Sequence, residues 1–205
     1  MSGKAVPFRE SLPNLRRLRL QCFRMTRISI DTPSYFFTSV THDRLPIFQT
    51  DKLKEITCNA LNEARNSGKF SIFAYAIMPD HDHIITDGKR EPSETLRYLN
   101  GVTAKRVLDY LKENDFTESL NKLRQFEKKR GYKHSVWEHH PDTFLITSET
   151  TFMQKVNYIH LNPVKDGLVE HPDDYLYSSA RIWHKRPLDV EPLEMNIDEI
   201  EWRKS

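Results

Sequence analysis

The chain has 205 residues, of which 38% are hydrophobic and 29% are charged, and its formal net charge is +2. This composition is typical of one water-soluble domain with tails, and no apolar run approaches the ~20 residues that a membrane-spanning helix needs. Cys22 and Cys58 form no CxxC pair and the first ten residues lack the apolar core of a signal peptide, so we expect free thiols and a cytoplasmic protein without membrane association.

Hydrophobic periodicity and turn residues predict strands and helices over most of the chain. In chain order they are a strand at 35–40, a helix at 51–66 ended by Gly68, strands at 70–77 and 83–86 around a turn at 78–80, a helix at 93–111, a basic helical stretch at 117–130, a strand within 136–147 and a final helix from about residue 150. The order strand-helix-strand-strand-helix-strand is that of a ferredoxin-like α+β fold, an antiparallel sheet with helices packed on one face.

The charges are unevenly distributed along the chain. Residues 1–30 hold seven Lys and Arg against one acid, a balance of +6, and residues 102–134 hold nine against five, a balance of +4. Residues 189–201 hold six acids and no Lys or Arg. Basic clusters beside an acidic segment indicate a polyanion-binding surface, although solvated helix faces give the same pattern. We expect a basic extension at 1–30, a folded domain at 31–180 and an acidic tail at 181–205.

Two histidines alternate at the head of the predicted third strand. Because successive side chains of a strand point to opposite faces, His81 and His83 share one face and can reach one metal ion, while Asp82 points away from it. The alternative is two histidines that face solvent or make ordinary hydrogen bonds.

An apolar stripe at helical spacing predicts the final helix and comprises Phe152, Val156, Ile159 and Leu161. Ser148 or Thr150 is expected to cap its start and Pro163 to close it, because the residue before a proline avoids the helical conformation. Tyr158 and Asn162 are four residues apart and therefore lie on one face of this helix. A helix tyrosine is more often a half-buried core residue than a catalytic one.

Four stretches, taken together and in this order, resemble a known family. They are Ala76-Ile-Met-Pro-Asp-His-Asp-His-Ile-Ile85, Val136-Trp-Glu138, Tyr158-Ile-His-Leu-Asn-Pro-Val-Lys-Asp-Gly-Leu-Val169 and Tyr175-Leu-Tyr-Ser-Ser179. From about residue 35 to about residue 179 the chain is similar to the HUH single-tyrosine transposases, and within them to the REP-associated tyrosine transposases of the IS200-like type.

The resemblance implies a metal-dependent endonuclease and strand transferase that cuts single-stranded DNA beside hairpins. Tyr158 would be the nucleophile and would stay joined to the 5′-phosphate of the cut strand, while His81, His83 and, by its position one turn after the tyrosine, Asn162 would hold Mg²⁺ or Mn²⁺. Two imidazoles are softer ligands than Mg²⁺ usually takes, so Mn²⁺ is expected to bind more tightly. The family includes homodimers that exchange tyrosine helices as well as forms that act alone, and its DNA substrate implies a place at the nucleoid.

The chain departs from the family at Asp82, where the residue between the two histidines is normally hydrophobic. On a regular strand this carboxylate enters the layer opposite the metal, where burial is costly unless the charge is paired. We consider four outcomes: a basic partner, a partly solvated strand end, a bulge that turns Asp82 toward the metal as an extra ligand, and a decayed or repurposed enzyme. The first two leave catalysis intact and the last does not.

Several basic residues are candidate phosphate contacts, namely Lys89, Arg90, Lys105, Arg106, Arg16, Arg17 and Arg19. Ordinary solvent-exposed charge would account equally well for the first four residues. The three arginines of the N-terminal extension either contact a DNA groove or belong to a flexible segment.

Other chemistry-bearing side chains have simpler explanations. His139, His140 and His160 are weaker ligand candidates, because isolated histidines usually have structural or solvent roles and His160 faces a different side of the helix from Tyr158. We expect packing roles for five further aromatic residues of the second half, Trp137, Tyr175, Tyr177, Trp183 and Trp202, the alternative for the three tryptophans being stacking on bases. The alternatives to a nuclease are a noncatalytic, domesticated hairpin-binding protein and a metal-dependent hydrolase unrelated to DNA.

Overall fold

The computed structural model describes residues 25–124 and 134–202. The predictions for Arg16, Arg17 and Arg19, and for most of the basic stretch after Arg124, lie outside these residues. No helix within the two described ranges is long and apolar enough to span a bilayer.

A four-stranded antiparallel sheet forms the centre of the molecule. Its strands are β1 (Ser34–Val40), β2 (Ile72–Ile77), β3 (His81–Asp87) and β4 (Asp142–Ile146), and they lie in the order β2-β3-β1-β4. All three neighbouring pairs are antiparallel. This arrangement confirms the predicted ferredoxin-like α+β fold.

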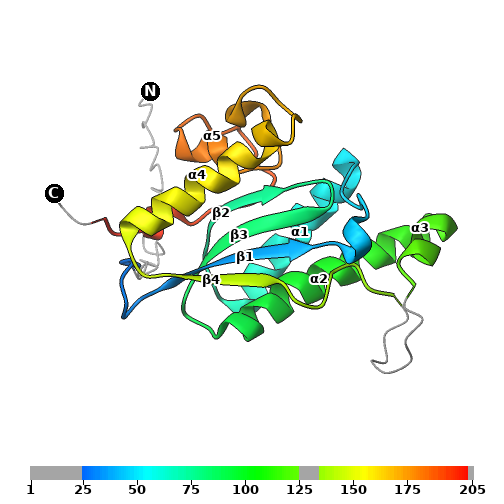
Figure 1. Cartoon of the computed structure of the whole chain (residues 1–205), viewed down its shortest axis with the longest axis horizontal. Helices are drawn as coiled ribbons and strands as arrows, with labels where there is room; N and C mark the ends of the chain where they lie inside the picture. Colours follow the sequence, from blue (N-terminus) through cyan, green and yellow to red (C-terminus); the bar gives the residue numbers. More distant parts are fainter. Residues whose placement is uncertain (1–24, 125–133, 203–205) are drawn as a thin grey trace, which may run out of the picture.

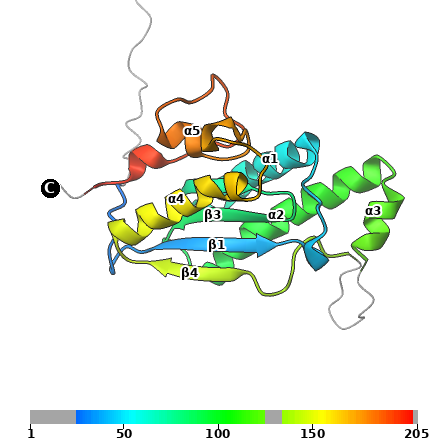
Figure 2. The same ribbon diagram turned by 45° about the horizontal axis from the view of Figure 1, so that its top comes forward.

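Helices cover both faces of the sheet. The long helices α1 (Asp51–Gly68) and α2 (Pro92–Glu113) pack together on one face, and α4 (Glu149–Lys165) lies across the other (Figures 1 and 2). α4 contacts β2 and β3, and it does so through the predicted stripe, because Phe152, Val156 and Ile159 are buried. Leu161 is 42% exposed and does not belong to this stripe.

α4 begins at the predicted cap but ends later than predicted. The Ser148 hydroxyl accepts a hydrogen bond from the Thr151 amide (3.2 Å), as an N-cap residue does. Pro163 lies inside the last turn instead of closing the helix. The helix stops at Gly167, which has a positive φ of 69°. The Gly167 amide donates to the Val164 carbonyl, and the amide of residue 168 donates to the Pro163 carbonyl. This is the Schellman arrangement, which needs a residue in the left-handed region.

Of the basic helical stretch predicted at 117–130, the described part is helical over α3 (Thr117–Lys122) alone. Arg124 is no longer helical and pairs with His134 in an isolated antiparallel bridge, and the rest of the predicted stretch lies outside the described residues. The strand β3 begins at His81 and not at residue 83, because the Met78 amide donates to the His81 carbonyl (2.8 Å) and makes the turn tight.

The acidic C-terminal segment packs on the domain through its short helices η3 (Pro172–Asp174), α5 (Ala180–Trp183) and η4 (Ile197–Glu199). Arg65 of α1 binds Glu194, and the Asn196 amide donates to the Ile72 carbonyl of β2 (3.0 Å). Residue Ile200 is buried and pairs with Thr26. One acid of this segment, Glu194, is therefore paired with a base of the domain.

Candidate active site on the α4 face of the sheet

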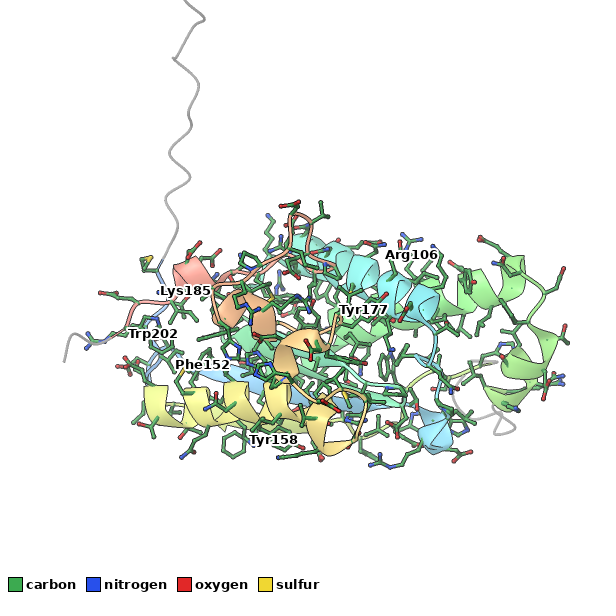
Figure 3. All side chains as sticks on the ribbon, turned by 90° about the horizontal axis from the view of Figure 1, so that it is seen from above. Arg106, Phe152, Tyr158, Tyr177, Lys185 and Trp202 are labelled. Carbon is green, nitrogen blue, oxygen red and sulfur yellow. The ribbon has the colours of Figure 1, made fainter. Side chains whose placement is uncertain are left out.

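Tyr158 lies over the histidine pair of β3. Its ring centroid is 5.2 Å from that of His83 and 5.9 Å from that of Phe36 on β1, in edge-on contacts. Figure 3 shows Tyr158 and Phe152 on opposite sides of α4. The helix thus buries its apolar face and leaves Tyr158 40% exposed beside the sheet. The predicted catalytic residue and the predicted metal ligands meet in one place.

His83 is buried and neutral, which suits a metal ligand. Burial, followed by the nearby charges of His81 and Lys155, lowers the pKa of His83 to about 3. Its Nδ1 lies 2.9 Å from the Thr38 hydroxyl, the neighbour across the β1–β3 pair, and its Nε2 accepts from the Asn162 amide nitrogen (3.1 Å). The lone pair of Nε2 therefore points toward α4.

His81 is oriented by an acid from the preceding turn. Its Nδ1–H donates to the Asp80 carboxylate (2.6 Å), which also accepts from Arg44 (3.1 Å). Burial raises the pKa of Asp80, but the hydrogen bonds from His81 and Arg44 outweigh it and hold that pKa below its usual range. Asp80 is therefore ionised, and its carboxylate keeps the proton of His81 on Nδ1.

Asn162 closes the triangle, and its position fits a cation. His81 Nε2 faces the Asn162 carbonyl oxygen at 3.4 Å. With the proton of His81 on Nδ1, both of these atoms are hydrogen-bond acceptors, so they repel each other unless a positive group lies between them. Two imidazole nitrogens and one amide oxygen are a reasonable donor set for a divalent metal ion. The residues present therefore fit the metal that the resemblance implies.

Two lysines that sequence reasoning missed lie on either side of the tyrosine. Lys165 Nζ is 5.0 Å and Lys155 Nζ 5.8 Å from the centroid of the Tyr158 ring. A signal for them existed, because residues 155, 158, 162 and 165 follow the spacing of one helix face. They add two positive charges to the face that carries the tyrosine.

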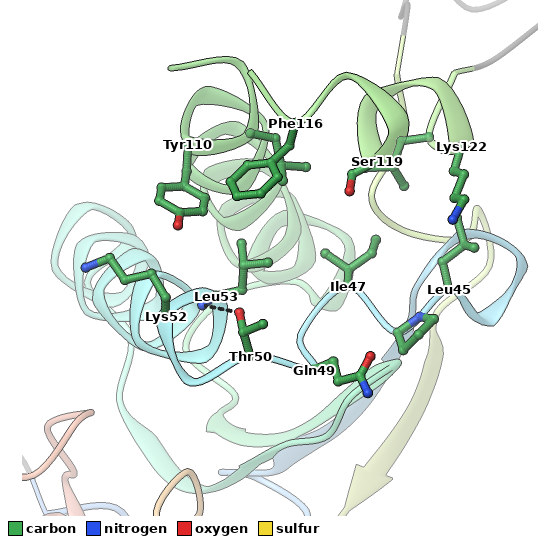
Figure 4. A pocket seen from close by; sticks show the side chains of 13 residues that line it. Leu45, Ile47, Gln49, Thr50, Lys52, Leu53, Tyr110, Phe116, Ser119 and Lys122 are labelled. Atoms are coloured by element: carbon green, nitrogen blue, oxygen red, sulfur yellow. Dashed lines mark hydrogen bonds between the residues drawn. The ribbon is translucent and has the colours of Figure 1, made fainter. Parts of the chain in front are cut away.

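These side chains line an open groove of about 860 Å³ between α4 and the strands β1, β3 and β4. Its walls also include Phe144 and Asp142 of β4 and Arg44 after β1. An apolar pocket of about 450 Å³ lies elsewhere, between the start of α1, the end of α2 and α3 (Figure 4). No histidine, cysteine or carboxylate lines that pocket, so it holds none of the side chains that the sequence predicted for catalysis or metal binding.

Asp82 follows none of the first three expected outcomes. It is 1% exposed, β3 pairs with β1 in regular register at this position, and the side chain lies on the α2 face with its cross-strand neighbour Ser39. Burial raises the pKa of Asp82 to about 7, an effect that Ser39 opposes. The Ser39 hydroxyl, however, donates to Asn100 of α2 (3.0 Å), and neither Asp82 oxygen has a hydrogen-bond partner among the described residues. Asp82 is thus buried on the face opposite the histidine pair, and no base of the described ranges pairs with it.

The four predicted basic contacts that the structure describes lie away from the groove. Lys89 and Arg90 follow the opposite end of β3 from His81, where Lys89 binds Asp87 (2.7 Å) and Arg90 binds Glu94. Lys105 pairs with an acid one turn later on α2, and Arg106 donates twice to Glu63 of α1. Figure 3 shows Arg106 on the far side of the molecule from Tyr158. Their role in DNA binding stays a prediction.

The other histidines do not join the site. His160 is buried, its Nε2 lies 2.9 Å from the Ser179 hydroxyl, and burial, followed by the charge of His184, lowers its pKa to about 4. His139 and His140 are exposed. A second cluster, His42, Asp43 and Glu138, has its ligand atoms within 4.8 Å of one another, but Asp43 and Glu138 are exposed and both pair with His42.

The predicted packing roles are confirmed for four of the five residues, whereas Trp202 is 39% exposed and meets Phe152 and Trp183 edge-on at the surface. Tyr175 and Tyr177 are buried and donate their hydroxyls to backbone carbonyls. Trp137 and Trp183 donate their indole N–H groups to the carbonyls of Asn100 and Phe73. These residues build the frame that carries the site.

A histidine pair on a ferredoxin-like sheet, facing a tyrosine on the following helix, defines the class of the single-tyrosine transposases. Residues 30–160 match the family described as transposase IS200 like. A protein of Haemophilus influenzae named as a REP-associated tyrosine transposase is 35% identical over 148 residues, which are 71% of this chain and 78% of that protein. The solved structure of a REP-associated tyrosine transposase bound to a REP hairpin shares the fold, with a TM-score of 0.55 and 20% identity over 80% of this chain and 86% of that one. The chain belongs to the IS200-like transposase family and, within it, to the REP-associated tyrosine transposases.

Proposed function

We propose that this protein is a metal-dependent endonuclease and strand transferase for single-stranded DNA that acts through a phosphotyrosine at Tyr158. The observation that carries the proposal is the convergence of Tyr158, His81, His83 and Asn162 on one open groove. A structural tyrosine would not need a histidine pair beside it whose ring nitrogens face a third polar group.

In the proposed reaction, the Tyr158 hydroxyl oxygen attacks a backbone phosphorus in line with the 3′ oxygen. The bond between tyrosine and phosphorus forms, the bond between phosphorus and the 3′ oxygen breaks, and the 5′-phosphate end stays on the protein. The phenol proton passes to solvent, which reaches the 40% exposed side chain, and the departing 3′ oxygen takes up a proton from solvent. A second 3′ hydroxyl reverses the attack, so strands are joined without ATP.

The residues around Tyr158 have separate roles in this reaction. His81 and His83 would hold the cation through Nε2, and Asn162 through its carbonyl oxygen. When bound, Mg²⁺ or Mn²⁺ would polarise a phosphate oxygen and offset the charge that builds on it. Lys155 and Lys165 attract the phosphate to the tyrosine and orient it.

We propose an unpaired strand beside a hairpin as the substrate, because the structural relative is bound to a REP hairpin and an open groove leaves room for a strand. Within this proposal the predicted basic residues keep a place as hairpin contacts, namely Lys89, Arg90, Lys105, Arg106, Arg16, Arg17 and Arg19, of which the first four lie outside the groove. Replacing each by Gln is expected to lower hairpin affinity about equally for all sequences and to weaken its salt dependence. Whether one chain or a homodimer acts is read from the mass of the protein–DNA complex.

The test is cleavage of a labelled pool of single-stranded hairpins with unpaired flanks, in Mn²⁺ or Mg²⁺, followed by a denaturing gel. A covalent protein–DNA band is expected for the wild type and is lost in Tyr158→Phe and His81→Ala. Tyr35→Phe and His139→Ala are matched controls outside the groove and should keep the band. Hairpin binding without an adduct in either metal would contradict the proposal and indicate a noncatalytic DNA-binding protein.

A further inference from the structure

An aromatic residue lies exposed on the edge strand of the sheet, next to the candidate active site. Phe144 of β4 is 44% exposed, and four of the five residues of this strand are exposed. In the described part of the chain, β4 pairs with β1 on one side and with no strand on the other. Leu145, the next residue, is 51% exposed and points to the opposite face. Packing among the described residues therefore leaves nearly half of the Phe144 side chain uncovered.

A lysine from α4 lies over this ring. Lys155 Nζ is 4.4 Å from the centroid of Phe144 and 4.6 Å from that of Phe36, which is its cross-strand partner on β1. Although these contacts attract the ammonium group, they leave its hydrogen-bond donors free for an anion. The described residues include no acid in a salt bridge with Lys155.

The rings form a continuous row from the metal ligands to the edge of the sheet. His81 and His83 are 4.8 Å apart between ring centroids, His83 stacks on Phe36 at 5.5 Å with an interplanar angle of 22°, and Phe144 follows on the neighbouring strand. All of these residues line the same groove as Tyr158. A strand whose phosphate lies at the tyrosine therefore has an aromatic surface beside it.

We propose that Phe144 and Lys155 form a binding subsite for one unpaired nucleotide next to the scissile phosphate, the base stacking on Phe144 and the phosphate binding Lys155. The inference rests on the proposed function and adds that the groove reads an unstacked base. Every base has a face that stacks on an aromatic ring, whereas a base inside a duplex does not expose that face. Asp142, two residues earlier on the same strand, also lines the groove and offers an acceptor to an exocyclic amino group.

The subsite is tested by equilibrium binding in the Tyr158→Phe background, which cannot cleave. The probes are hairpins with an unpaired flank that carries 2-aminopurine at one position at a time. Stacking is expected to quench the fluorophore at one position beside the scissile phosphate. Adding Phe144→Ala should remove this quenching and lower the affinity roughly 5- to 150-fold. Phe144→Trp should keep both the quenching and the affinity. Lys155→Met should reduce the slope of log affinity against log salt concentration by about 0.7, because one phosphate contact is lost.

Leu145→Ala is the matched control, because it removes a similarly exposed side chain from the same strand on the opposite face. It should leave quenching and affinity unchanged. A second control replaces the quenched nucleotide by an abasic one, after which Phe144→Ala should have no further effect. Equal affinities for Phe144→Ala and its parent, or the same loss with the abasic flank, would overturn the subsite.

The two proposals fail in different ways. A wild type that forms no covalent adduct, together with a Phe144-dependent stack, contradicts the nuclease and supports the subsite. An adduct with no effect of Phe144→Ala supports the nuclease and contradicts the subsite. No binding of any flanked hairpin contradicts both.

Discussion

Replacement of Asp82 by valine is expected to stabilise the protein, by an amount that grows with pH. Asp82 is buried on β3, and neither of its oxygens has a partner. Valine is apolar, close to aspartate in shape and well suited to a strand. Removing an unpartnered buried polar group is worth ~1–3 kcal/mol even when that group is uncharged.

The charge adds a pH-dependent part. The unfolded chain ionises Asp82 near the ordinary aspartate value of 3.8, whereas burial raises the folded pKa to about 7. Because the pKa of Asp82 is higher in the folded than in the unfolded chain, its contribution to the free energy of unfolding is most favourable below pH 3.8. The free energy of unfolding then falls as pH rises from 3.8 to about 7, and above pH 7 the loss is constant. At ~1.36 kcal/mol per pH unit, the cost is about 2 kcal/mol at pH 5 and about 4 kcal/mol at pH 8. The advantage of Asp82→Val should grow by roughly that difference.

The assay is urea unfolding followed by circular dichroism at pH 5, 6, 7 and 8, in constant ionic strength and with EDTA to keep the histidines free of metal. Only the difference between variant and wild type is used, so groups that titrate in both proteins cancel. Asp82→Asn keeps an unpartnered polar group without the charge, and should therefore remove the pH-dependent part alone.

Asp87 supplies a matched control with the opposite sign. It is equally buried on the same strand, but its carboxylate accepts from the Ser71 amide (3.0 Å) and binds Lys89. Asp87→Val should cost roughly 1–3 kcal/mol, because it leaves buried donors without partners. If Asp82→Val destabilised the protein as much as Asp87→Val, or if its effect were the same at pH 5 and pH 8, the account of Asp82 would be refuted.

Three further predictions concern the site and its frame. Mn²⁺ should raise the melting temperature of the wild type and have no effect on His83→Ala, as measured by thermal unfolding with and without the metal; an equal rise in both proteins would place the ion elsewhere. Gly167→Ala should lower the free energy of unfolding by about 1 kcal/mol, because φ is positive at this residue. Gly101→Ala in α2 should raise it by about as much, because an added Cβ meets nothing within 4 Å. Both changes are measured by urea unfolding, and changes of the same sign would contradict the role of Gly167 as the helix stop. Because burial lowers the pKa of His160, the wild type should lose stability as pH falls from 6.5 toward about 4, and His160→Gln should lose less over this range. If the stability of the two proteins changed in parallel with pH, a buried neutral His160 would be contradicted.

The sequence by itself determined which side chains share a face. The period of two placed His81 and His83 together on β3, and the spacing of four placed Tyr158 and Asn162 together on α4, because both periods follow from local backbone geometry. Lys155 and Lys165 continue the same helical spacing and were available to this reasoning. The ferredoxin-like order of elements was predictable for the same reason, since each element has its own apolar pattern.

Local signals failed where a competing interaction decided the outcome. Pro163 was expected to end α4, but the left-handed conformation of Gly167 satisfies the last carbonyls of the helix, and it ends there. The helical stretch that includes α3 was expected to continue to residue 130, but α3 ends at Lys122 and Arg124 pairs with His134. Neither contact could be read from the spacing of apolar residues along the chain.

Only the tertiary structure brought the two faces together. The side of the sheet on which α4 packs is set by burial of Phe152, Val156 and Ile159 against β2 and the C-terminal segment, which are far away in sequence. That choice places Tyr158 over His83, gives Lys155 the rings of β1 and β4, and leaves Asp82 in the opposite layer without a partner. Periodicity is a property of one segment, whereas the meeting of segments depends on which apolar surfaces can be buried together, and this is a property of the whole chain.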